Sequence, residues 1–490
     1  MDAMQQFFAI NREGILLTDS SKETNGETLS SEGLQRSMSS RQIQMLAIGG
    51  VIGVGLFYGA SLSVKLAGPA VILDFVICGL IVAIVMRTLG EMSVENPVSG
   101  SFSSYARELL GARVGFVTAG MWWFYWVATV MSELAAIGIL IEFWFPAVPA
   151  WVPGLIALIL FTLSNLLTVK IFGELEYWFA ILKVFAVAIF MVFGLLIVLT
   201  GLFNHGNVVG VTNLWVNGGF FPNGFLGMAM AISLVVQAYS GIETLAVEAG
   251  ETSNPDKNMR RAFRTVTVRI AVLYIGSIFI MLCAFPWNYL IHHPGSPYVL
   301  LFAKIGIPVA AGIVNLIIIL SGLSSCNTGL YGGSRMLFGS AKDSRYSTML
   351  RSLNSRHIPY IAVLITTAAI AVGIVITYLA PNNVYVWITS AAAFADLWVW
   401  GVILVSEIVF RKRANAEGKM LKFPVPFWPT TPIVGLLLVV LAFVAIVVSP
   451  LTRVSVFSGV IFLFILWVYH IYAEKRNVQL SVSGQDHIGK

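Results

Sequence analysis

Two apolar segments of the chain, each long enough to cross a bilayer, are interrupted at corresponding places. The first holds glycines within 49–55, and the sixth is broken at 239–243. Glycine destabilises a helix interior by about 1 kcal/mol relative to alanine, and unpaired backbone groups in hydrocarbon must find partners. Such breaks therefore persist where they line a cavity enclosed by protein, and paired breaks are typical of a secondary-transporter binding site.

The composition indicates a membrane protein. Of the 490 residues, 57% are hydrophobic and only 11% are charged, against about 25% charged residues in an average soluble domain. Apolar runs of roughly 20 residues can cross the hydrocarbon core. The chain holds such runs near 43–65, 71–90, 114–142, 152–170, 177–201, 225–250, 266–286, 309–334, 359–380, 384–410, 432–449 and 454–473. We therefore expect an all-α polytopic protein with twelve transmembrane helices in the lipid bilayer.

The basic residues predict the orientation of these helices. If both termini are cytoplasmic, the outer side holds only Lys65, Lys304 and Arg453 of the 30 basic residues, and Lys183 lies in mid-membrane. This distribution satisfies the positive-inside rule, so we expect a multi-pass protein of the cell membrane. The net charge of +6 follows from the topology and is spread over short loops, which argues against a nucleic-acid partner.

The twelve segments suggest two inverted repeats. Five crossings per repeat make the second repeat enter from the opposite side, and the two broken segments then become symmetry mates. The expected parts are a flexible cytoplasmic N-terminal tail (1–42), the first five-helix repeat (43–201), an extracellular loop (202–224), the second repeat (225–410), a proline-rich cytoplasmic linker (411–431), helices eleven and twelve (432–473) and a cytoplasmic C-terminal tail (474–490).

Neither metal binding nor enzymatic chemistry is indicated. Cys78, Cys283 and Cys326 all fall within predicted spans and lack the spacing of metal ligands or of a disulfide framework. The six histidines lie near span ends, in loops or in the tail, and no loop is large enough for an enzymatic domain. We expect no metal, no cofactor and no enzymatic activity. Nothing in the sequence specifies the oligomeric state.

The two breaks predict complementary halves of a binding site. Backbone N–H groups at Ile52, Gly53, Val54 and Gly55 would favour an anion such as a carboxylate. Carbonyl groups freed at the second break, over 239–241, would suit an ammonium group. Together they predict a site for a zwitterionic amino acid. The alternative is that the first set of glycines only allows close helix packing.

Several motifs resemble those of a known family. They are the runs Ile48 to Phe57, Met86 to Met92, Pro97 to Phe102, Gly250-Glu251 with Asn254-Pro255, Asn327 to Tyr331 and Ser334 to Leu337. Over about residues 36–475 the chain resembles amino acid permeases of the amino acid–polyamine–organocation superfamily. Within it, the chain is most similar to bacterial permeases for threonine, serine, alanine and glycine. The resemblance implies a five-plus-five inverted-repeat, LeuT-like fold with discontinuous helices 1 and 6, substrate between segments 1, 3, 6, 8 and 10, and proton symport.

Three ionisable residues are the candidates for proton coupling. Lys183 and Glu133 lie in the middle of predicted spans, where an ionisable side chain is costly and is a functional candidate by default. We expect the Glu133 carboxylate to contact the substrate amine or to share the transported proton. The resemblance places Lys183 where sodium-coupled relatives hold an ion, and it makes Glu243 a proton-sensitive position. Each has a structural alternative: a snorkelling or fixed lysine, a protonated glutamic acid bonded between helices at 133, and a cap for the unwound backbone at 243.

Other residues are candidates for gating. Glu91 is predicted in the loop between segments two and three, and we expect it and Glu251 to pair with arginines such as Arg260 or Arg335 as an inward gate. The alternative is a solvated face. Tyr239 precedes the second break, and the resemblance makes it a cover for the substrate. The break itself makes Ser240 and Gly241 candidate substrate contacts. Asp396 lies in the middle of segment ten and has no assigned role.

The favoured hypothesis is proton-coupled import of a small neutral amino acid by alternating access. Two alternatives stay open: an amino acid exchanger on the same fold, which would need a counter-substrate, and a receptor that binds an amino acid without transporting it. A channel is disfavoured, because glycine breaks and isolated buried charges fit a closed binding site better than a continuous polar pore.

Overall fold

The computed structural model divides the chain into two units, Met1–Ser37 and Met38–Lys490. It describes residues 23–24, 27–29, 35–36, 52–98, 101–167, 169–202, 204, 206–249, 255–292, 296–304, 308–341, 348–380 and 384–485. The first unit contains the short strands β1 (Glu23–Thr24), β2 (Glu27–Leu29) and β3 (Gln35–Arg36), paired antiparallel in that order. The flexible tail expected over 1–42 stays a prediction.

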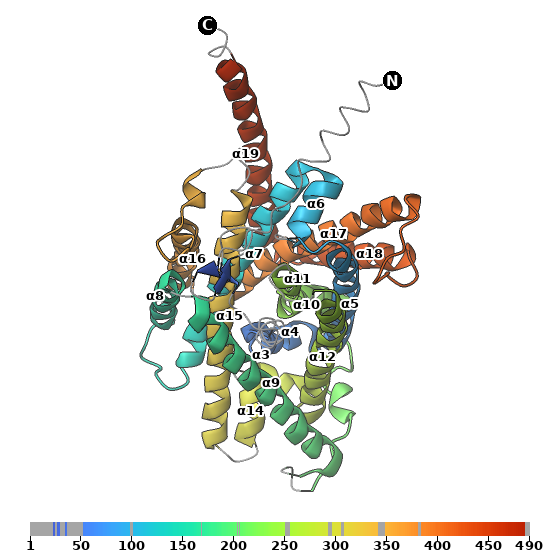
Figure 1. Ribbon diagram of the computed structural model, residues 1–490. Helices are drawn as coiled ribbons and strands as arrows, with labels where there is room; N and C mark the ends of the chain where they lie inside the picture. The colour runs from blue at the N-terminus through green and yellow to red at the C-terminus, as the bar shows by residue number, and fades with distance from the viewer. Residues whose placement is uncertain are drawn as a thin grey trace. The chain divides into compact units, whose positions relative to one another are not determined.

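The second unit is helical in its regular structure (Figure 1). Each of the twelve predicted segments corresponds to one helix or to a broken pair of helices. In chain order these are α3 (Val54–Phe57) with α4 (Gly59–Ala67), α5 (Val71–Glu95), α7 (Ala112–Ile141), α8 (Trp151–Leu167), α9 (Val169–Thr200), α10 (Gly224–Tyr239) with α11 (Thr244–Ala249), α12 (Pro255–Ala284), α15 (Pro308–Ser340), α16 (Tyr360–Leu379), α17 (Val384–Ala416), α18 (Thr430–Val448) and α19 (Arg453–Gln485).

The apolar runs explain why these helices form. Within the described residues, ten helices are long and apolar enough to cross a membrane, and α8 is a shorter apolar helix. Helix α18 carries no ionisable side chain and begins directly after Pro429. Proline is tolerated at the start of a helix because its missing N–H is not needed there. Large apolar side chains remain exposed along α18 and α19, as expected for helix faces that contact lipid. A helical, multi-pass membrane fold of the second unit is thereby confirmed.

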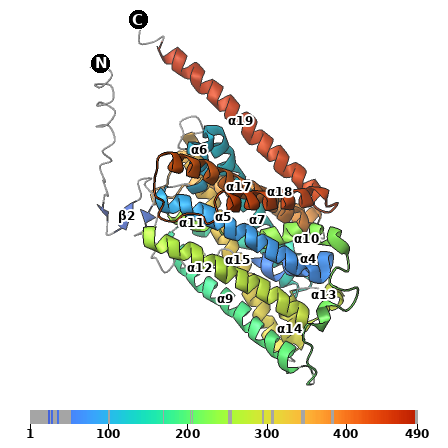
Figure 2. The same cartoon turned by 90° about the vertical axis from the view of Figure 1, so that its right-hand side faces the viewer.

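Corresponding segments of the two halves pack against each other in pairs. Helix α4 packs on α10, α5 on α12, α7 on α15, and α8 on α16. In each pair, one helix comes from segments one to four and the other from segments six to nine. Figure 2 shows α5 and α12 running alongside each other. Such pairing is what a pseudo-two-fold axis between inverted repeats produces for helices near the axis.

Several helices extend further than the apolar runs predicted. Helix α5 continues to Glu95, α12 begins at Pro255, and α17 reaches Ala416, so charged stretches assigned to loops are helical. A search for apolar runs finds only the part of a helix that lies in hydrocarbon, whereas charged residues are compatible with helix beyond it. Three short helices in connections were also not predicted: α6 (Ser101–Leu110), α13 (Trp287–His292) and α14 (Pro297–Lys304).

Candidate functional site

The second predicted break is present in the sixth segment. Helix α10 ends at Tyr239, Ser240 is extended, and α11 begins at Thr244. Gly241 has a φ of 91°, a left-handed conformation that side chains disfavour, so glycine permits the chain to leave the helix here. The chain therefore crosses the middle of this segment with non-helical backbone.

The first segment is described from Ile52 onward. Gly53 caps the short helix α3, and α4 follows after Tyr58. Gly49 and Gly50 lie outside the described residues. A Cβ added at Gly55 would lie 3.3 Å from the Cα of Ala238, so the two broken segments pass each other closely. Gly55, from the described part of the first predicted break, therefore lies beside Ala238 at the end of α10.

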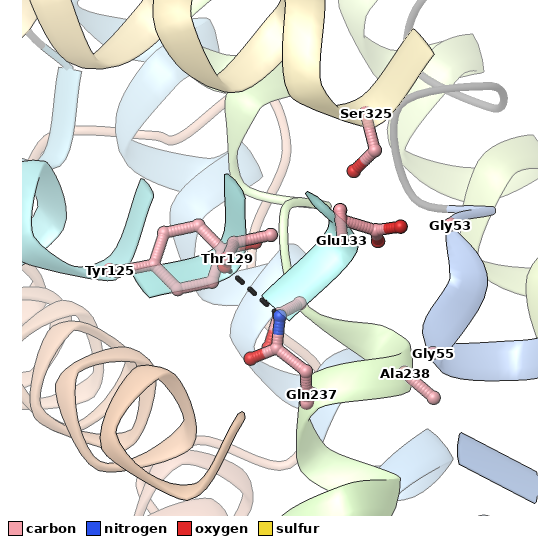
Figure 3. A pocket seen from close by; sticks show the side chains of 9 residues that line it. Gly53, Gly55, Tyr125, Thr129, Glu133, Gln237, Ala238 and Ser325 are labelled. Carbon is pink, nitrogen blue, oxygen red and sulfur yellow. Dashed lines mark hydrogen bonds between the residues drawn. The ribbon is translucent and has the colours of Figure 1, made fainter. Parts of the chain in front are cut away.

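A small polar cavity lies between the two breaks. It is lined by residues of α3, α7, α10 and α15 and of the second break: Gly53, Gly55, Tyr125, Thr129, Glu133, Gln237, Ala238, Ser240 and Ser325. Figure 3 shows these side chains converging from different helices. The cavity volume of about 10 Å³ is the space of roughly one water molecule. Side chains therefore fill most of the room between the breaks.

The Glu133 carboxyl contacts the backbone at the first predicted break. The Val54 N–H donates to both carboxyl oxygens of Glu133, at 3.2 and 3.1 Å. Figure 3 shows the Glu133 carboxyl pointing toward Gly53. The side chain is buried, and a Cβ built on Gly53 would lie 2.3 Å from Glu133 Oε1. Glycine at 53 is thus required for this carboxyl to approach the backbone.

Lys183 contacts α15 next to a residue that lines the cavity. It is 1% exposed, and its Nζ donates to the Ser324 hydroxyl at 2.7 Å. The next residue, Ser325, lines the cavity beside Glu133. The charges of Lys183 and Glu133 interact electrostatically. Consecutive serines of α15 therefore connect two of the three predicted proton-coupling residues.

Glu243 lies in the second break, and its carboxyl contacts two tryptophans. Trp122 Nε1 donates to one of its carboxyl oxygens at 2.9 Å, and Trp400 Nε1 approaches the other at 3.5 Å. The group is fully buried. The structure therefore holds this carboxyl by indole N–H groups.

Sequence reasoning assigned no role to several polar residues of the site, including Asp396, Gln237 and Thr129. Ser240 Oγ lies 2.7 Å from Asp396 Oδ2, and Gln237 Nε2 donates to Thr129 Oγ1 at 3.0 Å. Asp396 could have been identified as a functional candidate from sequence, because it is an acidic residue in the middle of a predicted span. Gln237 and Thr129 carried a weaker signal, since uncharged polar residues are common in membrane helices.

Tyr239 and Ile52 lie at the breaks but are not among the residues that line the cavity. The Tyr239 hydroxyl donates to the Phe75 carbonyl at 2.9 Å, and its ring packs against Phe75 and Tyr274. The Ile52 carbonyl accepts a hydrogen bond from Ser321 at 2.7 Å. Their roles as substrate cover and substrate contact stay predictions.

The predicted loop location of Glu91 was wrong, its arginine partner is Arg411, which the sequence did not name, and its role in gating stays a prediction. The residue lies in helix α5, not in a loop, and its carboxyl is fully buried. It forms an ion pair with Arg411 at 2.8 Å and accepts the N–H of Val425 from the linker after α17. The guanidinium of Arg335 lies over the Tyr331 ring at 3.2 Å.

The remaining gating candidate, Glu251, lies outside the described residues, as does the side chain of Arg260. No metal site can be assigned either: within the described part of the chain, no group of three or more histidine, cysteine, aspartate or glutamate side chains is placed to hold a metal ion.

Comparison with known proteins shows the family. Residues 42–481 match the family model described as amino acid permease. The chain is 42% identical to the uncharacterized amino acid permease YtnA of Bacillus subtilis, covering 89% of this chain and 95% of YtnA. It is 36% identical to the probable threonine/serine transporter YbxG of the same organism, covering 93% and 98%. It is 35% identical to the aromatic amino acid transport protein AroP of Escherichia coli, covering 91% and 97%.

These matches extend over nearly the whole length of both partners, so they cover the broken segments and the cavity between them. The relatives are named as permeases and transporters, which agrees with the prediction that this is no enzyme. With its multi-pass helical fold, this chain belongs to the amino acid permease family.

Proposed function

We propose that this protein imports a small neutral amino acid, such as threonine, serine or alanine, together with a proton. The observation that carries the proposal is the cavity between the two breaks, whose lining includes Thr129, Gln237, Ser240 and Ser325 beside Glu133. Small hydroxyl and amide side chains suit a short, polar substrate. The similarity to YbxG, named a probable threonine/serine transporter, supports the same substrate class.

The substrate carboxylate would bind the backbone N–H groups of the first break, from which Glu133 must withdraw. The substrate ammonium would bind carbonyl groups at the end of α10. Closure of the cavity to the space of about one water molecule supports alternating access, because admission of an amino acid requires the broken segments to move.

Proton coupling would use Lys183, Glu133 and Glu243. The buried Lys183 ammonium, bonded to Ser324, would occupy the position that an ion holds in sodium-coupled relatives. The protein would lie in the cell membrane with both termini cytoplasmic, and the repeats would rock against each other about the cavity.

Uptake in reconstituted liposomes tests the proposal. Labelled threonine, serine, alanine and lysine are supplied outside, with and without an inward proton gradient. A gradient of one pH unit corresponds to about 1.4 kcal/mol, and one-proton symport then supports roughly tenfold accumulation. We expect such accumulation for a neutral substrate and none for lysine. Uptake that is independent of the gradient and requires internal amino acid would indicate exchange and not symport.

A further inference from the structure

Asp396 is a fully buried acid in the middle of α17. Its Oδ2 lies 2.7 Å from the hydroxyl of Ser240, a residue of the second break that lines the cavity. Its Oδ1 has no hydrogen-bond partner among the described residues. An ionised carboxylate buried with one bare oxygen would be strongly destabilised.

The Ser240 hydroxyl has two neighbours and only one hydrogen. Its Oγ lies 3.0 Å from the Val236 carbonyl and 2.7 Å from Asp396 Oδ2. The Ser240 N–H, which would bond the Val236 carbonyl in a continuing helix, bonds the Gln237 carbonyl at the end of α10. The Val236 carbonyl is therefore one of the helix-end groups that need an external donor, and the Ser240 hydroxyl supplies one.

Both short contacts are hydrogen bonds only if Asp396 carries a proton. The Ser240 hydroxyl then donates to the Val236 carbonyl, and the Asp396 carboxyl donates from Oδ2 to Ser240 Oγ, at a distance typical of O–H···O bonds. If Asp396 is ionised, the single hydroxyl hydrogen turns to the carboxylate and the buried Val236 carbonyl loses its donor.

The charges around Asp396 favour the same state. Glu243 of the second break and Tyr125 of α7 both interact with the Asp396 carboxyl. Helix α18 packs against α17 without any ionisable side chain, and the ionisable groups of α5, α6, α10 and α19 have no interaction with Asp396 among those described. Two interacting buried carboxyls resist double ionisation, and no cationic group among the described residues interacts with Asp396.

We propose that Asp396 is a proton-binding residue of the transport cycle, protonated while the cavity is closed and linked to the second break through Ser240. When the break opens, water reaches Oδ2 and takes up the proton, and Asp396 stays behind as a carboxylate. The Ser240 hydroxyl then turns from Val236 to Asp396, and the helix end loosens at the cavity. This inference rests on the proposed proton symport and adds a residue to it.

Asp396→Asn is the decisive variant, because an amide keeps a donor toward Ser240 but cannot release a proton. We expect counterflow, which exchanges labelled for unlabelled substrate without net proton movement, to persist. We expect gradient-driven accumulation, roughly tenfold per pH unit in the native protein, to fall to the level of passive equilibration. Asp74→Asn is the matched control: Asp74 is a buried acid of α5 with both oxygens unpartnered among the described residues, and it is outside the cavity.

The outcomes separate two failures. If the native protein shows no gradient-driven accumulation, the proposed symport fails. If the native protein accumulates substrate and Asp396→Asn does so equally, the role of Asp396 is refuted.

If Asp396→Asn is folded but inactive in both assays, infrared difference spectroscopy of the purified proteins decides. A carboxylic-acid carbonyl band present in the native protein and missing in Asp396→Asn supports the proposal. Carboxylate bands in its place overturn it.

Discussion

The ammonium of Lys183 and the hydroxyl of Ser324 are joined by a 2.7 Å hydrogen bond. This bond ties α9 to α15 one residue away from Ser325, which lines the cavity beside Glu133. The buried Lys183 amine is thereby held against the helix that carries Ser325. Because Lys183 interacts with Glu133, substitutions of the two residues can be combined to test their coupling.

Replacement of Lys183 should abolish coupling. In Lys183→Met the side chain keeps most of its length but loses the charge and the bond to Ser324, so we expect gradient-driven uptake to fall by at least about tenfold. Uptake of labelled threonine into proteoliposomes measures this. Lys304→Met, which removes a partly exposed lysine of α14, should transport normally. Equal loss in both variants would show that the effect is not specific to Lys183.

The changes in unfolding free energy caused by replacing Lys183 and Glu133 should not be additive. Removing one charge leaves the other buried with less compensation, whereas removing both leaves none. We expect Lys183→Met with Glu133→Gln to be more stable than the sum of the single variants predicts, by about 0.5–3 kcal/mol. Unfolding of the four proteins in detergent gives this coupling energy. Strict additivity would mean that the two charges do not interact.

Gly53→Ala should displace Glu133 from the first break. The new Cβ would lie 2.3 Å from Glu133 Oε1, closer than atoms approach without a shift, so the bond from Val54 cannot persist in its present form. We expect transport to fall by about tenfold or more, the effect of losing a charge-assisted hydrogen bond. Gly401→Ala is the control, because its Cβ would meet Val439 at an ordinary 3.9 Å. Comparable losses in both variants would contradict the steric argument.

The linker after α17 should depend on one ion pair. Glu91 is fully buried and Arg411 is 17% exposed, and the same Glu91 carboxyl accepts the N–H of Val425. Breaking a buried pair costs about 3–5 kcal/mol, so Arg411→Met should markedly lower the apparent Tm.

The exposed pair Arg113–Glu474, with side chains 42% and 47% exposed, offers the control. Such surface pairs contribute about 0–1 kcal/mol, so Arg113→Met should change the apparent Tm little. A similar apparent Tm for the two variants would contradict the claim that the Glu91–Arg411 pair stabilises the linker.

Much of the fold could be predicted, because apolar runs and glycine breaks are local features of the sequence. The break at 239–243 was found because Gly241 interrupts an apolar span, and the position of Lys183 because it is a lysine in mid-membrane. Partners were less accessible. Asp396 lies 156 residues from Ser240, and Glu91 lies 320 residues from Arg411, so only tertiary packing brings them together.

The error at Glu91 has a physical reason. Charged residues near the end of segment two suggested a loop, yet α5 continues to Glu95, and Glu91 is buried there beside Arg411 and Val425. The Val54 N–H illustrates a different limit. The sequence predicted that this N–H lies outside regular helix bonding, but its partner, Glu133, depends on how α7 packs against the first segment.

The central claim is that substrate and proton move together, and proton flux tests it most directly. The protein is reconstituted in liposomes that enclose a pH-sensitive dye, and threonine is added outside without an imposed gradient. Our account predicts that the interior becomes more acidic as labelled threonine enters, and that a protonophore abolishes the acidification. Entry of labelled threonine with no change in internal pH would contradict the account.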